Sequence, residues 1–374
     1  MQSSAPLASA LFSLQQPQQQ QKQQTDEQPR RRRWVPVSRV ELLFVTWGLF
    51  VLAAHLSAQA NAAQRMTQCY LVVHPWFTSR PACSVVVINC HREQMNDEHN
   101  DNDNDNDTVA RTTPLLQALD GRTLTTLVAT HCVAWTMPPV VQRFPQLQNI
   151  VLYNVTLRAW DRAAAVTQRR HPALSHVFLG DVRMTEFPRG LLHEDVPRSL
   201  TNVEVSRTNL SVLPEDMGDV WKTNEWVRFH FENSPLTRVP LSFWRLGVRR
   251  ISFINSAIER LPDDAIAHAS VEILRLTGNP LTALPSLPPK DLRTLHRLTA
   301  ERSQLTALPH WIEVWWRSTP ADRKISFYGT PLCRDNVNNA SEMMKAVCLT
   351  TYTDENQGIV PWETMTTLLP VVDG

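Results

Sequence analysis

The chain has 374 residues, a formal net charge of +1 at pH 7 and 43% hydrophobic residues. That composition supplies enough apolar material for a large core or a long repeat array. The near-neutral charge argues against the broad basic surface that phosphate-backbone binding requires, so we expect no nucleic-acid partner.

Residues 1–39 are polar and basic. They contain a Gln-rich tract at residues 15–24 and four consecutive arginines at residues 30–33. Such a segment cannot bury enough apolar surface to offset its ordering entropy, so we expect a disordered tail. The arginines predict that this tail stays on the cytoplasmic side of a membrane.

An apolar run follows from Leu42 to Leu56, and then Ala58-Gln59-Ala60. Fifteen helical residues span roughly 22 Å, less than the roughly 30 Å hydrocarbon core, which favours a signal peptide cleaved after Ala60. The long polar lead and the neighbouring alanines favour a retained signal-anchor helix over residues 40–60. Both alternatives stay open, and both deliver the rest of the chain across the membrane.

All six cysteines follow this segment. An even number, clustered behind an export segment, predicts disulfides in an oxidising compartment, with reduced buried thiols as the alternative. No C-x-x-C spacing supports structural zinc. The first four cysteines allow three pairings, a bond to Cys132 being one possibility, and the last two form the expected C-terminal bridge. The cysteines are Cys69, Cys83, Cys90, Cys132, Cys333 and Cys348.

Residues 93–107 form an acidic, Asn-rich run without apolar residues apart from Met95, which predicts an unstructured loop. The alternation at residues 101–105 resembles part of a calcium loop. An EF-hand needs Gly at its sixth position and a carboxylate at its twelfth, where this chain has Asn106 and Thr112. We therefore expect no metal site here.

From residue 124 the pattern L-x-x-L-x-L-x-x-(polar)-x-L recurs at intervals of 22 to 27 residues. In nine units, 35 of the 36 residues at positions 1, 4, 6 and 11 are apolar, the exception being Asp322. Positions 4 and 6 face the same side of a short strand. The units start at Leu124, Leu147, Leu174, Leu200, Trp226, Val248, Val271, Leu295 and Asp322.

An independent signal supports this register. In seven units an apolar residue followed by proline stands three residues after position 11, and proline suits a turn better than a central strand. These pairs are Met137-Pro138, Phe187-Pro188, Leu213-Pro214, Val239-Pro240, Leu261-Pro262, Leu284-Pro285 and Leu308-Pro309.

The repeats resemble those of the leucine-rich-repeat superfamily over residues 124–332. The resemblance implies an α/β solenoid with a curved parallel sheet on its concave side and short helical or irregular convex segments. Position 9 departs from the pattern, because only Asn279 is Asn there. Val155 and Val182 cannot satisfy backbone groups as Asn does, so we expect irregularity near them.

A narrower likeness is to uncharacterised membrane-anchored leucine-rich-repeat proteins of oomycetes. It rests on the membrane segment, the cysteine block at residues 69–93 and the closing YGTPLC at residues 328–333. It implies a surface protein and indicates no ligand. Residues 61–123, with strand candidates at residues 71–73 and 85–88, should cap the first unit, and residues 333–374 should form the C-terminal cap and tail.

Positions 3, 5 and 7 of each unit should point away from the core. The first three units offer apolar and aromatic residues there, and the later units a basic row, so we expect a protein, peptide or glycan ligand on the concave face. An ordinary solvated sheet face is the alternative. The candidate binding residues are Tyr153, Phe178, Arg228, His230, Arg250, Arg275, Arg297 and Tyr328.

Searches for hydrolase, metalloprotease, nucleotide-binding and kinase motifs find nothing, so we expect no enzymatic activity and no cofactor. Two hypotheses remain: an extracytoplasmic recognition module, and a wall-associated structural or adhesive protein in which the solenoid is a spacer. N-glycosylation acceptors stand at Asn106, Asn154, Asn209 and Asn339.

Overall fold

The computed structural model describes residues 38–62, 66–95, 107–222, 224, 226–318, 323–336 and 341–352. The chain divides into two units, residues 1–51 and 52–374, and each is described by itself. Nearly all of the predicted tail, the alternation at residues 101–105 and Asp322 lie outside the described residues.

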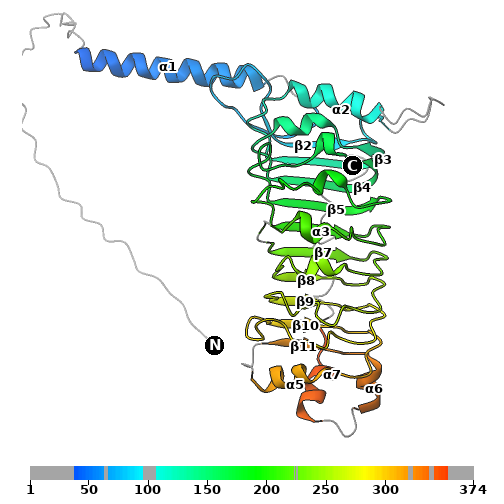
Figure 1. Ribbon diagram of the computed structural model, residues 1–374. Helices are drawn as coiled ribbons and strands as arrows, with labels where there is room; N and C mark the ends of the chain where they lie inside the picture. The colour runs from blue at the N-terminus through cyan, green and yellow to red at the C-terminus, as the bar shows by residue number, and fades with distance from the viewer. Residues whose placement is uncertain are drawn as a thin grey trace, which may run out of the picture. The chain divides into compact units, whose positions relative to one another are not determined.

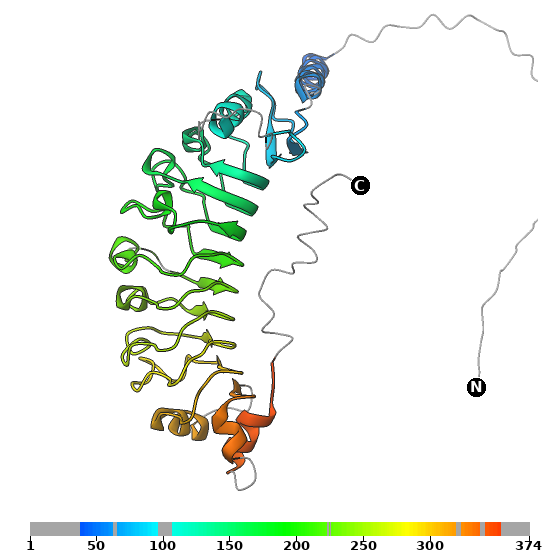
Figure 2. The same cartoon turned by 90° about the vertical axis from the view of Figure 1, so that its right-hand side faces the viewer.

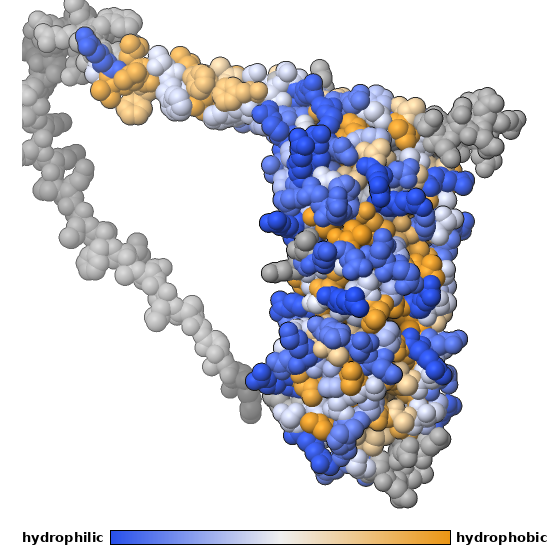
Figure 3. All heavy atoms as spheres, in the orientation of Figure 1, coloured by the Kyte–Doolittle hydropathy of each residue, from blue (hydrophilic) through white to orange (hydrophobic). Residues whose placement is uncertain are grey.

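Helix α1 (Arg39–Ala62) contains the predicted apolar segment. The Ser38 hydroxyl accepts a hydrogen bond from Glu41 N at 3.2 Å, and the Glu41 carboxylate accepts one from Ser38 N at 2.7 Å, so a capping box starts the helix. Its 24 residues correspond to roughly 36 Å, so the helix extends beyond the apolar run Leu42–Leu56 to the length of a hydrocarbon core. The alanines continue the helix, and Figure 3 shows apolar residues along most of it.

Eleven strands form one sheet in chain order (Figure 1). The strands are β1 (Cys69–Val72), β2 (Cys83–Asn89), β3 (Thr126–Thr136), β4 (Asn149–Ala159), β5 (His176–Arg183), β6 (Asn202–Ser206), β7 (Arg228–Glu232), β8 (Arg250–Ser252), β9 (Ile273–Arg275), β10 (Arg297–Thr299) and β11 (Lys324–Ser326). The helical segments after α1 are α2 (Asp107–Ala118), η1 (Pro139–Arg143), η2 (Arg162–Ala164), η3 (Arg189–Leu191), α3 (Met217–Val220), α4 (Leu241–Trp244), α5 (His310–Arg317), α6 (Pro331–Asn336) and α7 (Glu342–Leu349).

The sheet is parallel from β2 to β11, and β1 pairs antiparallel with β2. Strand β2 aligns Val85 with Thr126 of β3, so the cysteine block extends the sheet and caps the first unit as expected. The cap strands are somewhat longer than the sequence candidates. Helix α2 begins at Asp107, the last residue of the predicted unstructured loop.

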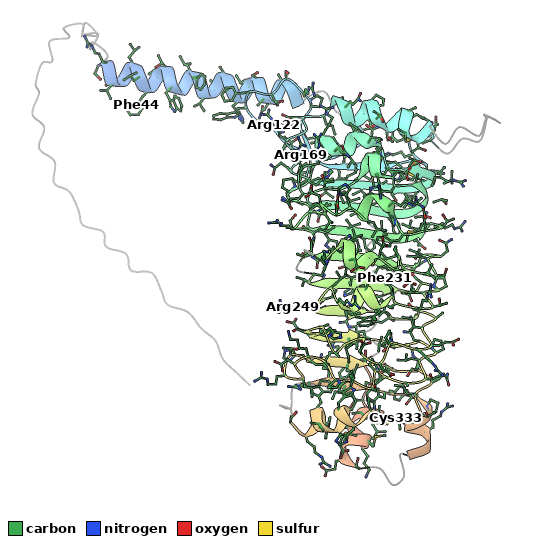
Figure 4. The ribbon with its side chains drawn as sticks, in the orientation of Figure 1. Phe44, Arg122, Arg169, Phe231, Arg249 and Cys333 are labelled. Atoms are coloured by element: carbon green, nitrogen blue, oxygen red, sulfur yellow. A yellow bond between two sulfur atoms is a disulfide. The ribbon has the colours of Figure 1, made fainter. Side chains whose placement is uncertain are left out.

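The predicted core positions are buried in every unit, with two exceptions among the 36. Asp322 lies outside the described residues, and Ala134 is only half-buried. The prediction at Ala134 is wrong because β3 contains a register shift there, so that Trp135, fully buried, pairs with Leu157 in its place. Figure 4 shows Phe231, 1% exposed, inside the stack.

In each unit, one residue with the left-handed backbone conformation follows the strand or lies within it. All nine residues at position 8 have φ between 51° and 76°, which turns the chain at the same place in every unit. Gly278 adopts this conformation without a Cβ penalty, whereas arginine does so at two units. The nine are His131, Asn154, Asp181, Arg207, Asn233, Asn255, Gly278, Arg302 and Gly329.

The apolar-proline pairs precede the convex segments. Pro138, Pro188, Pro240 and Pro309 stand directly before η1, η3, α4 and α5, where the fixed φ of proline suits a helix start. Figure 2 shows the strands along one side of the stack and the short helices along the other. The expected α/β solenoid with a parallel sheet is confirmed.

Three disulfides close the two ends. Cys69 pairs with Cys83, Cys90 with Cys132, and Cys333 with Cys348. The second bond joins Cys90, the residue after the capping strand β2, to β3 and confirms the link to Cys132. The third joins α6 to α7 at the end of the stack, where Figure 4 shows Cys333.

Candidate functional site

The parallel register assembles the side chains at positions 3, 5 and 7 into columns that cross the strands, and we call this surface the strand face. At position 5, Phe178 aligns with Glu204, Glu204 with His230, and His230 with Ser252. The column then continues through Arg275 and Thr299. At position 3, Arg228 aligns with Arg250. Seven of the eight candidate binding residues therefore lie on strands of this face, and Tyr328 stands two residues after the end of β11.

These residues differ in accessibility. Tyr153, Phe178 and His230 are 4%, 5% and 5% exposed, so they are nearly closed off from solvent. Arg250 is exposed, and Tyr328 is 47% exposed. The remaining arginines, at residues 228, 275 and 297, are half-buried. The strand face thus has a buried centre and accessible flanks.

A carboxylate organises the centre of the strand face. Glu204 Oε1 lies 3.1 Å from Arg228 Nη1 and 3.6 Å from His176 Nε2. Burial raises the pKa of Glu204, but the hydrogen bonds and charge of its basic neighbours, His176 and Arg228 among them, outweigh it, so that the pKa lies below its usual value. Glu204 is therefore an anion held between basic partners.

His230 stands beside this anion as a neutral imidazole. Burial, only partly offset by Glu204, lowers the pKa of His230 to about 3. His230 Nδ1 and Arg228 Nε are buried and have no hydrogen-bond partner among the described residues. A buried polar atom without a partner costs about 1–3 kcal/mol, so these two atoms lower the stability of the fold.

The basic row predicted at position 3 is partly neutralised. Arg228 pairs with Glu204, and Arg250 Nε lies 3.6 Å from Glu272, which also pairs with Arg249. The partners come from a neighbouring unit. The two glutamates are visible in the sequence, but which arginine each one pairs with depends on which units are adjacent in the stack.

An apolar strip lies at the other end of the face, as predicted. Val128 and Phe178 are buried at position 5 of β3 and β5, and Val151 between them is half-buried. Tyr153 packs edge-on against His131, with ring centroids 5.8 Å apart. Burial raises the pKa of Tyr153, so its hydroxyl stays protonated and can donate a hydrogen bond.

One contribution to the face was missed by the sequence reasoning. The chain returns after α7, and Ser326 Oγ donates to Thr350 O at 2.6 Å. Tyr352 N then donates to Glu301 Oε1 at 2.7 Å, and Thr351 Oγ1 to Glu301 Oε2 at 3.2 Å. No repeat pattern marks this segment, so only its position in space reveals it.

The Tyr352 ring completes this contact. Arg297 and Lys324 lie over it at 5.8 Å and 5.5 Å from its centroid, in cation–π geometry. Two members of the basic row therefore face an aromatic residue of the same chain.

Two of the glycosylation acceptors can be located. Asn154 and Asn209 are exposed, and Asn106 and Asn339 lie outside the described residues. Asn154 stands at the left-handed turn, with its Nδ2 2.7 Å from His131 Nδ1. The Asn209 side-chain oxygen accepts from Met184 N at 2.7 Å. Modification of either site remains a prediction.

Residue groups with the composition of a metal site were sought in the described ranges, and none was found there. In the same ranges one helix, α1, is long and apolar enough to cross a membrane.

No family model matches the chain. A curated protein, leucine-rich repeat serine/threonine-protein kinase 1 of Mus musculus, is 26% identical over 170 residues, which cover 45% of this chain and 8% of the kinase. The chain therefore corresponds to less than a tenth of that relative.

Solved structures with similar chains include a complex of Latrophilin 3, Unc5D and FLRT2 (TM-score 0.39, 14% identity, 63% of this chain and 84% of that chain). Drosophila Toll bound to Spatzle gives a TM-score of 0.34 at 14% identity, over 61% of this chain and 40% of that chain. A leucine-rich-repeat protein of Leptospira interrogans gives 0.32 at 16% identity, over 68% and 74%. The fold assignment rests on the register and the parallel sheet described above. The domain is a leucine-rich-repeat solenoid.

Proposed function

We propose that this solenoid is an extracytoplasmic recognition module that binds a protein, peptide or glycan on its strand face. The observation that carries the proposal is the accessible flank of that face, where Arg250 is exposed and Tyr328 is 47% exposed. Exposed arginine and tyrosine side chains are residue types that anchor bound partners. The binding residues are the eight predicted from sequence.

Export of the domain is supported by two features. All six cysteines form disulfides, which persist in oxidising compartments, and α1 is long enough to span a bilayer. We propose a single-pass membrane protein with the arginine cluster cytoplasmic, as the likeness to oomycete proteins implies. Cleavage after Ala60 would instead release a secreted protein. The mature N-terminus decides between them, since a start at Asn61 means secretion.

Binding can be tested with two accessible residues of the strand face. Arg250→Glu combined with Tyr328→Ala should reduce capture of surface proteins or glycans by the full chain about ten-fold or more. The control is Arg245→Glu with Arg260→Glu, two exposed arginines that stand at none of positions 3, 5 and 7, and Arg245 directly follows α4. The measurement is quantitative mass spectrometry or glycan-array binding with all three proteins.

The same experiment separates the alternative function. If the two variants and the unmodified chain capture the same partners in equal amounts, the strand face is not the binding surface. A wall-associated spacer, in which the solenoid only separates other elements, then becomes the better account.

A further inference from the structure

The N-terminal cap presents a cluster of apolar side chains to solvent. After α1, the described residues include four exposed aromatic side chains, and three of them lie within residues 70–77 of the cap: Tyr70, Trp76 and Phe77. Leu71 and Val72 are 50% and 37% exposed beside them. Phe77 is 79% exposed, more than any other large apolar side chain of the described residues. Soluble monomers rarely leave a large apolar cluster open, so the cluster indicates a contact surface.

Hydrogen bonds to one residue, Asp120, hold the loop that carries two of these aromatic residues. Asp120 N donates to Pro81 O at 2.9 Å. Thr78 Oγ1 donates to Asp120 Oδ2, also at 2.9 Å. The turn at Trp76 and Phe77 is therefore attached to the folded cap and presents its two rings at a defined place.

The backbone conformation of Phe77 is costly for a bulky side chain. Its φ is 66°, in the left-handed region that glycine adopts without penalty. Unlike the nine left-handed residues at position 8, Phe77 belongs to no repeated turn. Its ring stands edge-on to the ring of Trp76, with centroids 6.2 Å apart, and is not compensated by burial. Residues held in this way concentrate at ligand contacts, which favours a binding role for this loop.

We propose that the loop at residues 74–80 contacts the membrane in which α1 is anchored. Trp76 and Phe77 enter the headgroup layer of the bilayer, and Arg80 and Arg122 bind lipid phosphates. The inference rests on the proposed membrane anchoring of α1. It goes beyond the recognition function, because that function requires no contact between the cap and lipid.

The chain itself keeps the cap close to the end of the helix. Helix α1 ends at Ala62, and β1 begins seven residues later at Cys69. Seven residues reach at most roughly 25 Å, so the start of β1 stays within that distance of the helix end. The last strand lies ten strand steps from β1, which is roughly 48 Å at about 4.8 Å per step. Of the two ends of the solenoid, the cap is the one that the chain confines near a bilayer crossed by α1.

The residue types of the loop suit the headgroup layer. Aromatic side chains with a polar edge are enriched at membrane interfaces, because that layer is apolar on one side and wet on the other. Beside the tip lies a shallow hollow of about 280 Å³. Its lining residues are Phe77, Thr78, Ser79, Arg80, Asp120 and Arg122.

This hollow has a basic character. Asp120 already pairs with Arg122 at 3.3 Å, and two arginines outweigh the single carboxylate. The Arg122 side chain is 78% exposed, and Arg80 is exposed as well, so both guanidinium groups are accessible to a lipid phosphate. Figure 4 shows Arg122 at the capped end of the solenoid.

A photo-cross-linker at the tip of the loop tests the contact. The full chain with Phe77→p-benzoylphenylalanine is reconstituted into vesicles of equal parts phosphatidylcholine and phosphatidylglycerol and irradiated. We expect peptides with covalently bound lipid at residue 77, identified by mass spectrometry. The control, Val314→p-benzoylphenylalanine, places the same group on α5, where Val314 is 45% exposed. Its lipid adducts should not exceed those of a sample kept in the dark.

Each other result overturns the proposal. Equal lipid adducts at both positions, cross-links to a second copy of the chain in place of lipid, or no cross-link at residue 77 would each do so. Alkaline extraction of the vesicles reports separately whether α1 is anchored. Protein released from the vesicles would overturn the anchor and the contact together, whereas retained protein without adducts would overturn the contact alone.

Charge removal tests the role of the arginines. In the chain with the cross-linker at residue 77, Arg80→Gln should lower the yield of lipid adducts by up to about five-fold, and added salt should reduce this difference. The matched control, Arg260→Gln, removes the same charge from an exposed arginine outside the cap and should leave the yield unchanged. Equal yields in the two variants would overturn the assignment of Arg80 to lipid phosphate.

Phe77→Gly separates membrane contact from folding. Glycine adopts the left-handed turn without strain, so the melting temperature of this variant should equal or exceed that of the unmodified chain. A lower melting temperature would show that Phe77 serves the fold of the cap and would count against the membrane contact.

Discussion

The early and late units build the same turn in different ways. Strands β3 and β4 have 11 residues each, whereas β8 to β11 have three. Position 9 is Cys132, Val155 or Val182 in the early units, and there the strand pairing continues past the left-handed residue.

In the late units position 9 is polar. Asn279 donates to Leu276 O at 2.9 Å and also to Phe253 O, and it accepts from Ile258 N at 3.1 Å. Ser303 and Thr330 donate to the carbonyl three residues earlier. A side chain at position 9 that hydrogen-bonds to the backbone ends the strand. An apolar side chain there leaves the backbone N–H and C=O groups to pair with the neighbouring strand. The irregularity predicted near Val155 is present between β3 and β4, whose register shifts directly after the pair of Cys132 with Val155, whereas β4 and β5 stay in register at Val155 and Val182.

The largest expected effect comes from the aromatic core of the late units. Phe229 lies 5.1 to 5.5 Å from the rings of Trp221, Trp226, Phe231 and Phe243. Phe229→Ala should lower the free energy of unfolding by about 3–5 kcal/mol, because a large cavity remains. Ile150→Val in the aliphatic early core should cost about 0.5–1.5 kcal/mol. Urea denaturation of both variants checks this, and equal losses would contradict the contrast.

A smaller effect tests the two kinds of turn. Asn279→Val should lower the free energy of unfolding by about 1–3 kcal/mol, because the carbonyls of Phe253 and Leu276 and the N–H of Ile258 lose their partner. Thr306→Val, an exposed change in the next unit, should stay within about 0.5 kcal/mol. If Asn279→Val is as stable as the unmodified chain, side-chain capping does not hold the late turns.

A third effect concerns acid. The pKa of His230 falls from 6.5 to about 3 on folding, so the unfolded chain binds a proton that the folded chain excludes between these values. The free energy of unfolding should therefore decrease as the pH falls below 6.5. His230 should account for about 1.4 kcal/mol of this decrease per pH unit. Buried His171 has a pKa shifted in the same direction and should add to the loss.

His230→Gln isolates that contribution. Chemical denaturation between pH 6.5 and 5 should show that the free energy of unfolding of this variant depends less steeply on pH. The difference should correspond to at most one proton, because Glu204, Arg228 and Arg275 keep their charges. An unchanged slope would show that His230 is not held neutral in the folded chain.

Much of the fold was predictable because repeat periodicity is a local property. Leu274 and Leu298 were assigned to the core from spacing alone, and both are buried. The candidate residues Arg228 and His230 were placed on one face for the same reason. Ala134 was assigned wrongly because a register shift has no signature in a fixed spacing.

The sequence by itself determined the repeat register, the apolar spine and the residues of the strand face, since each depends on neighbours a few positions apart. Only the tertiary structure decided the pairing of Cys90 with Cys132, the capture of Arg228 by Glu204, and the return of Tyr352 to Glu301. These contacts join residues 24 to 51 positions apart, and their distances exist only once the units have stacked.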